Sequence, residues 1–214
     1  MSESELFEHG YAVLIGVDEN ATPGAELPTV ARDVQALNDV LVHPQRCAYK
    51  SKNVRLLMGR EATGKNILES LDWLQQRVTA DPQATTVIYY SGHGHVDKAS
   101  GQYYLIPYDF QGLSRLDESA IKAETFTGRL AAIQAPRTLI ILDCCHAEGM
   151  DAKAFYEIPI VERAPFPIDN LGAKAIPGYT GEPGGKALDE LIDGEGRAVL
   201  NSSKEDQLSW VRKD

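Results

Sequence analysis

Two short segments of the chain carry side chains that can do covalent chemistry. Residues 89–94 read Tyr-Tyr-Ser-Gly-His-Gly and contain His93, and residues 143–149 read Asp-Cys-Cys-His-Ala-Glu-Gly and contain Cys145. A thiolate attacks a carbonyl carbon, and an imidazole within hydrogen-bond reach removes the thiol proton and later protonates the leaving amine. Backbone N–H groups must receive the oxyanion, and a glycine beside the histidine lets the backbone approach closely. We therefore take His93 and Cys145 as candidate catalytic residues, and the amides of Gly94 and Cys145 as candidate oxyanion donors.

The hydrophobic pattern predicts the elements that must position these residues. Short apolar runs predict strands at residues 11–17, 54–58, 85–90, 102–106, 138–142 and 197–201. Apolar residues at helical spacing predict helices between them, in three sets: Val30, Val34, Leu37 and Leu41; Ile67, Leu71, Leu74 and Val78; and Phe126, Leu130 and Ile133. Strands that alternate with helices indicate an α/β fold with a mostly parallel sheet. Because sites in such sheets lie beyond the carboxyl ends of strands, we expect His93 and Cys145 to share one edge.

The two segments together resemble the paired histidine and cysteine motifs of metacaspases and their bacterial relatives, the orthocaspases. Segments 11–18, 105–109 and 197–207 also resemble the first strand, the segment after the histidine and the pocket strand of that family. The resemblance implies a caspase-type three-layer sandwich with helices on both faces of the sheet. It also implies a His93–Cys145 dyad that cleaves peptide bonds through a thioester. The 52 residues from His93 to Cys145 agree with the caspase spacing of about 50.

The same resemblance suggests a specificity pocket. Asp33, within Ala-Arg-Asp-Val at 31–34, and Asp206, within Ser-Lys-Glu-Asp-Gln at 203–207, match the pocket carboxylates of the family, although Glu205 could take the place of Asp206. Two carboxylates would pair with a guanidinium or ammonium group. The implied substrates are therefore proteins or peptides with Arg or Lys before the scissile bond. Cys144 stands where the metacaspase motif usually has serine, so the second cysteine is the implied nucleophile.

The sequence divides into three parts. Residues 1–150 are expected to form a large-subunit-like catalytic domain, 151–186 a loop or linker, and 187–214 the start of a small-subunit-like portion that ends early. The linker has five prolines and five glycines without sustained periodicity, which is typical of a functional loop. Its candidate self-cleavage points are Lys153, Arg163, Lys174 and Lys186. The family resemblance also implies an upstream activator or partner, a role in a proteolytic cascade, and calcium activation; the candidate oxygen ligands are Asp169, Glu182, Asp189 and Asp193. No cofactor is otherwise expected.

The composition limits which classes of binding partner and which cellular compartment we expect. A formal net charge of −10 disfavours nucleic acid and anionic membranes as partners. No run approaches the roughly 18 apolar residues of a spanning helix, and the first ten residues lack the pattern of a signal peptide. Three cysteines, two of them adjacent, make a poor disulfide framework and favour a reducing cytoplasm.

Three other interpretations compete with the peptidase. Zinc binding would use the same histidines and cysteines, but no Cys-x-x-Cys pair occurs. Residues 59–66, Gly-Arg-Glu-Ala-Thr-Gly-Lys-Asn, are similar to a phosphate-binding loop of an NTPase, but Asn66 stands where a Ser or Thr hydroxyl is needed. A cap formed by Thr63 on the following helix explains this segment equally well. The third alternative is a non-catalytic caspase-like scaffold, although both dyad residues are present.

Overall fold

The computed structural model describes residues 6–21, 25–97, 99–100, 102–146 and 196–201. Its strands are β1 (Gly10–Gly16), β2 (Val54–Met58), β3 (Thr85–Val96), β4 (Tyr103–Leu105), β5 (Ile121–Lys122), β6 (Arg137–His146) and β7 (Gly196–Asn201). Its α-helices are α1 (Pro28–Val42), α2 (Gly64–Thr79), α3 (Leu116–Ser119) and α4 (Ala123–Ala132), and its 3-10 helices are η1 (Ser51–Asn53), η2 (Gly59–Glu61) and η3 (Leu113–Arg115). All six strands expected from the sequence are found, and the two-residue strand β5 is added. The predicted divisions at 150/151 and 186/187 lie outside the described residues.

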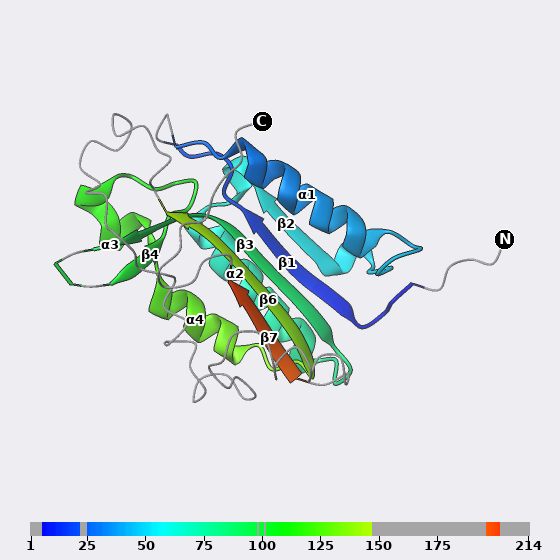
Figure 1. The fold of residues 1–214 in the computed structure, drawn as a ribbon. Coiled ribbons are helices and arrows are strands. Elements are labelled where there is room, and N and C mark those ends of the chain that lie inside the picture. Colours follow the sequence, from blue (N-terminus) through cyan, green and yellow to red (C-terminus); the bar gives the residue numbers. More distant parts are fainter. Residues whose placement is uncertain (1–5, 22–24, 98, 101, 147–195, 202–214) are drawn as a thin grey trace.

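One mixed sheet forms the centre of the fold. Strands β2, β1, β3, β6 and β7 follow one another side by side and are all parallel. The last residues of β3 continue beyond the end of β1 and pair with β4 in antiparallel orientation, and β4 pairs with β5 in the same way. The carboxyl ends of the parallel strands therefore lie together along one edge of the sheet, and β3 is the middle strand of the five (Figure 1).

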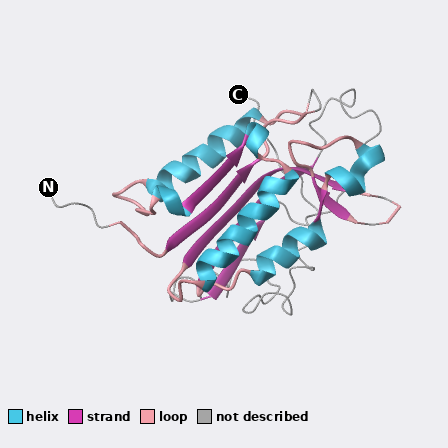
Figure 2. Ribbon diagram, turned by 180° about the vertical axis from the view of Figure 1, so that it is seen from behind, coloured by secondary structure: helices cyan, strands magenta, loops and turns pink. Residues whose placement is uncertain are grey.

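Helices cover both faces of the sheet. Helix α1 lies on one face, over β1 and β2, whereas α2 and α4 lie on the other face, as the two opposite views show (Figures 1 and 2). Alternate strand residues build the two cores: Leu14, Val87 and Tyr89 pack on the α1 side, and Ile15, Ile88 and Tyr90 pack on the α2 side. Together with the parallel sheet, this confirms the predicted three-layer α/β sandwich. Within the described part of the chain, no helix has the length and apolar character needed to cross a membrane.

A polar cluster holds the amino-terminal end of the sheet together. The carboxylate of Asp81, in the turn between α2 and β3, accepts hydrogen bonds from the Nδ1 of His9 at 2.9 Å, the hydroxyl of Tyr11 at 2.9 Å and the amide of Gln83 at 3.0 Å. Burial alone would raise the pKa of Asp81, but these hydrogen bonds outweigh it and lower the pKa below its ordinary value. The start of β1 is thereby fixed to the start of β3.

We expect Asp81→Asn to lower the stability of the folded protein by about 1 to 2 kcal/mol, since hydrogen bonds to a charged acceptor are lost. For a domain of this size that is a fall in Tm of about 2 to 8 °C at neutral pH. The folded state releases the Asp81 proton at a lower pH than the unfolded state does. The contribution is therefore complete above the ordinary aspartate pKa of about 3.9 and disappears as pH falls through the lowered value.

The matched control is Asp72→Asn, because Asp72 forms an ion pair with Arg129 on the surface, with 45% of its side chain exposed. Such pairs contribute at most about 1 kcal/mol. Thermal unfolding curves that show equal losses for both variants would contradict a special role for Asp81.

Candidate active site

The backbone places the two predicted catalytic residues on neighbouring strands. Strands β3 and β6 are parallel partners from Thr85 with Arg137 to Gly94 with His146, and His93 is the register partner of Cys145. The sequence predicted strands that end at residues 90 and 142; instead, β3 continues through residues 91–94 and β6 continues to His146. The local pattern could not show this, because each glycine-rich or polar segment is held extended by hydrogen bonds to the other.

A hydrogen bond between side chains marks the face of the sheet on which His93 lies. Ser91 and Asp143 are register partners two residues before His93 and Cys145, and the fully buried Ser91 hydroxyl donates to Oδ2 of Asp143 over 3.2 Å. Residues two apart in a strand belong to the same face. Positions 93 and 145 therefore continue the face on which Ser91 and Asp143 meet.

The environment of His93 fixes its tautomer. The imidazole is buried, with 3% of the residue exposed, and its Nε2 lies 3.0 Å from the carbonyl oxygen of Ala25. A carbonyl only accepts, so Nε2 carries the proton and donates it. Nδ1 is then the acceptor nitrogen of the neutral ring, and it is buried without a hydrogen-bond partner among the described residues. Burial lowers the pKa of His93, although the hydrogen bond to Ala25 acts in the opposite direction. The result is a neutral imidazole with an acceptor atom ready to take a proton.

The loop that carries Ala25 is attached to the segment that follows β4. The amide of Ala21 donates to the carbonyl of Tyr108 at 2.8 Å, and the amide of Leu27 closes the loop on the carbonyl of Asp18 at 2.8 Å. Ala25 itself is buried in a small cluster with Ile106 and Phe110. Sequence reasoning missed Ala25, because any residue type can offer a backbone carbonyl.

The amide of Gly94 points toward the strand that carries Cys145. The carbonyl of His93 accepts from the amide of Ile106, next to β4, at 3.0 Å. In a trans peptide the N–H lies opposite the C=O, and no cis peptide bond occurs among the described residues. The Gly94 N–H is therefore directed away from β4 and toward β6, with which β3 is paired through Gly94.

Position 94 requires glycine for a steric reason. A Cβ atom built on Gly94 would lie 1.8 Å from the hydroxyl oxygen and 2.5 Å from Cζ of Tyr103. We expect Gly94→Ala to cost about 1 to 3 kcal/mol of stability, the usual range for overpacking a core. Gly128→Ala is the matched control, because nothing lies within 4 Å of a Cβ at Gly128 in α4. This second change should leave the stability unchanged or raise it by up to about 1 kcal/mol, through the helix propensity of alanine. Unfolding curves with equal Tm for Gly94→Ala and wild type would contradict the predicted clash.

The other predicted residues lie at different places. Asp33 is on α1 with an exposed side chain, and α1 directly follows the loop that carries Ala25. Asp206 and the candidate calcium ligands Asp169, Glu182, Asp189 and Asp193 lie outside the described residues. Within the described ranges, no group of three or more His, Cys, Asp and Glu side chains could hold a metal ion. His95 is buried two residues beyond His93, and burial lowers its pKa against the opposing effect of Asp97.

In residues 59–66, the segment similar to a phosphate-binding loop, three backbone amides already donate hydrogen bonds to side chains of the protein. The amide of Gly59 donates to Asp18 at 2.7 Å, that of Gly64 to Asp109 at 2.9 Å, and that of Asn66 to the Thr63 hydroxyl at 3.2 Å. Two carboxylates therefore stand where an NTPase would place phosphates. The predicted cap by Thr63 on α2 is confirmed, and this geometry favours it over a nucleotide site.

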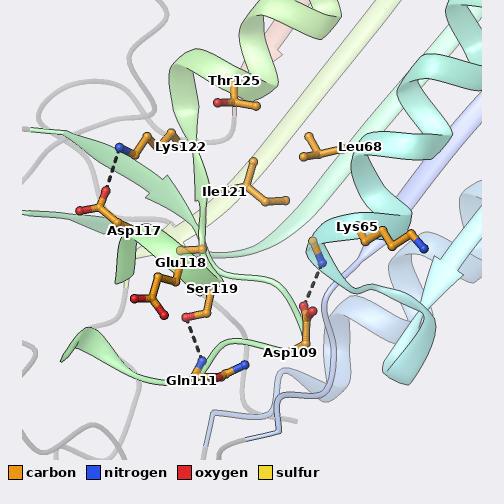
Figure 3. A pocket seen from close by; sticks show the side chains of 12 residues that line it. Lys65, Leu68, Asp109, Gln111, Asp117, Glu118, Ser119, Ile121, Lys122 and Thr125 are labelled. Carbon is orange, nitrogen blue, oxygen red and sulfur yellow. Dashed lines mark hydrogen bonds and ion pairs between the residues drawn. The ribbon is translucent and has the colours of Figure 1, made fainter. Parts of the chain in front are cut away.

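A cavity of about 410 Å³ lies beside this helix end, between α2, the segment before β5, and α4 (Figure 3). Much of its polar lining is already paired within the protein: Asp109 accepts from Gly64, Asp117 forms an ion pair with Lys122, and the Ser119 hydroxyl accepts from the amide of Gln111 (Figure 3). None of the predicted site residues lines it. We therefore place the candidate active site at the His93 edge instead.

Comparisons with known proteins agree with the α/β fold described above. A family model described as Caspase domain (Peptidase_C14) matches residues 9–213. The crystal structure of protein GSU0716 from Geobacter sulfurreducens is similar with a TM-score of 0.50 and 16% identity, covering 93% of this chain and 74% of that one. At that identity the likeness concerns the fold alone. No curated protein matches. Because the family model spans nearly the whole sequence, the chain belongs to the caspase-domain family of cysteine peptidases.

Proposed function

We propose that this protein is a cysteine endopeptidase that cleaves after Arg or Lys, with Cys145 as nucleophile and His93 as general base. The observation that carries the proposal is the tautomer of the buried His93 ring, together with the pairing of His93 with Cys145 in the strand register. Its Nε2–H is held by Ala25, and its Nδ1 is a buried acceptor without a described partner. A neutral imidazole held in one tautomer is what a general base for a thiol requires.

The reaction then proceeds in two steps. His93 Nδ1 takes the thiol proton of Cys145, the sulfur attacks the peptide carbonyl, and the oxyanion is received by the amides of Gly94 and Cys145. His93 returns the proton to the amine of the leaving peptide, and a thioester remains on Cys145. Water, deprotonated by His93, hydrolyses the thioester and restores the thiol. The Ala25 carbonyl stabilises the imidazolium that forms in each step, since it accepts from Nε2.

The substrate preference rests on Asp33 together with Asp206. A guanidinium or ammonium group pairs with carboxylates through charge-assisted hydrogen bonds. The exposed side chain of Asp33, on the helix that follows the Ala25 loop, is open to a substrate. The preference for a basic residue follows from the similarity to metacaspases.

We expect Asp33→Asn to raise KM for peptides with Arg at the scissile position, and to lower kcat/KM about tenfold, from the loss of one charge-assisted hydrogen bond. Tm should not change, because the side chain is exposed. Asp39→Asn is the matched control on the same helix, since Asp39 is also exposed and its side chain accepts from Gln35 and Asn38 of α1. If both variants have the wild-type KM, Asp33 does not contact the substrate.

Processing and regulation are part of the same proposal. A peptidase with basic specificity can cut its own linker at Lys153, Arg163, Lys174 or Lys186, and so take part in a proteolytic cascade of stress, defence or cell death. The candidate calcium ligands are Asp169, Glu182, Asp189 and Asp193, because calcium prefers carboxylate and carbonyl oxygens. Intact-mass measurement of fully active enzyme tests the self-cleavage, and an uncut linker would exclude it as a requirement.

The peptidase activity is tested with fluorogenic peptides that differ only in Arg, Lys or Asp at the scissile position. We expect turnover of the first two and none of the third. Labelling with a peptidyl-Arg electrophile, followed by mass spectrometry of the digest, should place the adduct on Cys145 rather than on Cys47 or Cys144. Cleavage after Asp would overturn the pocket and leave the dyad intact. A chain that neither cleaves nor reacts, with calcium or after limited proteolysis, would instead be a non-catalytic scaffold.

A further inference from the structure

His93 is held at two of its atoms by two parts of the chain that pack against each other. Its Nε2 donates to the carbonyl of Ala25 at 3.0 Å, and its own carbonyl accepts from the amide of Ile106 at 3.0 Å. Ala25 and Ile106 are both buried, with 2% and 4% exposed, and lie in one small apolar cluster with Phe110. The position of the imidazole therefore depends on how the loop that carries Ala25 docks on segment 106–110.

Segment 106–110 is itself attached to the main body of the fold. The amide of Tyr108 donates to the carbonyl of Ala62 at 2.9 Å, and the carboxylate of Asp109 accepts from the amide of Gly64 at 2.9 Å (Figure 3). Both contacts join the segment to the start of α2, a helix whose buried apolar side chains belong to the largest core cluster. A loop that docks on segment 106–110 is therefore docked on a fixed support.

Two consecutive residues of the Ala25 loop bond to two consecutive residues of this segment. Nδ2 of the half-buried Asn20 donates to the carbonyl of Pro107 at 3.2 Å, and the backbone amide of Ala21 donates to the carbonyl of Tyr108 at 2.8 Å. Any residue except proline supplies the backbone donor at position 21. The bond at position 20, in contrast, requires a side chain that donates, and asparagine has one.

We infer that Asn20 is a positioning residue for the general base. By fixing the Ala25 loop to segment 106–110, it keeps the Ala25 carbonyl at Nε2 of His93, and this carbonyl keeps the ring in the tautomer whose Nδ1 accepts a proton. If the carbonyl moves away, the ring can carry its proton on either nitrogen, and a neutral ring protonated at Nδ1 cannot take the thiol proton. The inference rests on the proposed function, because it assigns Asn20 a task within the same site.

The first measurement is the tautomer of His93, by NMR of the full chain labelled with ¹⁵N-histidine. The parent for this measurement is Cys145→Ala, which lacks the proposed nucleophile, and the His93 signals are identified by their loss after His93→Ala. We expect the parent to carry the proton on Nε2. Adding Asn20→Ala should bring the two ring ¹⁵N chemical shifts closer together, because part of the molecules then carry the proton on Nδ1. Unchanged ring shifts in this variant would overturn the inference.

The second measurement is the pH profile of kcat for a fluorogenic peptide with Arg at the scissile position. In Asn20→Ala one weakened hydrogen bond should lower kcat about 2- to 10-fold, with KM unchanged. The bond to Ala25 raises the pKa of His93 against the effect of burial, so weakening the bond lowers the pKa further. The fall in activity at low pH should therefore move to a lower pH. Asn20 carries no charge, and the charged groups on the flanking elements, Asp18 after β1 and Asp143 on β6, are unchanged.

Asn53→Ala is the matched control. The side-chain amide of Asn53 also donates to a backbone carbonyl, that of Glu8 at 3.3 Å, but it does so before the first residues of β1 and β2, at the opposite end of these strands. We expect Asn53→Ala to lower Tm at least as much as Asn20→Ala does, because the carbonyl of Pro107 keeps a hydrogen bond from the amide of Phe110 at 3.3 Å. It should nevertheless leave the His93 tautomer and the pH profile as in the parent.

Equal changes of tautomer and pH profile in Asn20→Ala and Asn53→Ala would show a general loss of stability and overturn the inference. A failure of the proposed function has a different signature. If wild type neither cleaves the peptide nor reacts with the peptidyl-Arg electrophile, the peptidase proposal fails, while the NMR comparison still decides whether Asn20 holds the His93 ring.

Discussion

Replacing Cys145 with alanine is expected to lower kcat for an Arg-containing peptide on the order of 10⁴-fold or more, because the atom that forms the acyl-enzyme is removed. Backbone register pairs Cys145 with His93, the residue whose Nδ1 is a buried acceptor, whereas it pairs the preceding Cys144 with Gly92. Of the two adjacent cysteines, Cys145 is therefore the one whose register neighbour carries a proton acceptor. The measurement is the steady-state rate at saturating peptide, together with the loss of labelling by the electrophile.

Cys144→Ser is the control that separates the two adjacent cysteines. It replaces the thiol with the residue that metacaspase motifs usually have at that position, so the rate should stay close to that of wild type. Thermal unfolding of both variants should show wild-type Tm values, which would exclude unfolding as the cause of lost activity. An active Cys145→Ala and an inactive Cys144→Ser would move the nucleophile to Cys144, and with it the register argument would fail.

The parts of this fold that depend on local pattern were predictable from the sequence. Strand β2 begins and ends at the predicted residues, α1 covers the predicted apolar positions and begins at Pro28, and Thr63 caps α2 as proposed. Each depends on residues close in sequence: an apolar run, a proline that presets its φ angle, or a hydroxyl that accepts from an amide three residues later. The shared edge of His93 and Cys145 was also predictable, because parallel strands end together.

The details that shape the site depend on partners far away in the sequence. The contact of His93 with Ala25 spans 68 residues, and an alanine carbonyl gives no signal in residue type. The steric need for Gly94 arises from Tyr103, in a strand that runs antiparallel to β3. The extension of β3 beyond Tyr90 and of β6 beyond Leu142 likewise requires each strand as a partner of the other. In every case the determining interaction is tertiary, and local propensity is overridden by it.

Replacing His93 with alanine is expected to lower kcat/KM for the same peptide by about 10³-fold, within the range typical of a lost general acid–base group. The pH profile of wild type should report the same group. Burial lowers the pKa of His93 from its ordinary value of 6.5, so the imidazole stays neutral, and able to accept the thiol proton, at a pH where an exposed histidine is already protonated. Activity should therefore persist below pH 6.5 and fall only as the pH passes through the lowered value, where the ring gains a proton and Nδ1 ceases to be an acceptor. Where the Cys145 thiol and the His93 imidazole titrate together, this fall in activity at low pH (the acid limb of the profile) reports an apparent pKa of the pair.

His95→Ala is the matched control for this prediction, because His95 is also buried, burial also lowers its pKa, and it lies two residues farther along the same strand. The two histidines differ in one respect that matters for the mechanism. His93 pairs in register with Cys145 and donates to Ala25, whereas the register partner of His95 that the structure describes is Tyr104, in β4. We therefore expect His95→Ala to keep most of the activity and to leave the acid limb unchanged. An equal loss for both variants, at equal Tm, would mean that burial at this edge of the sheet, rather than the neighbour of Cys145, determines the effect.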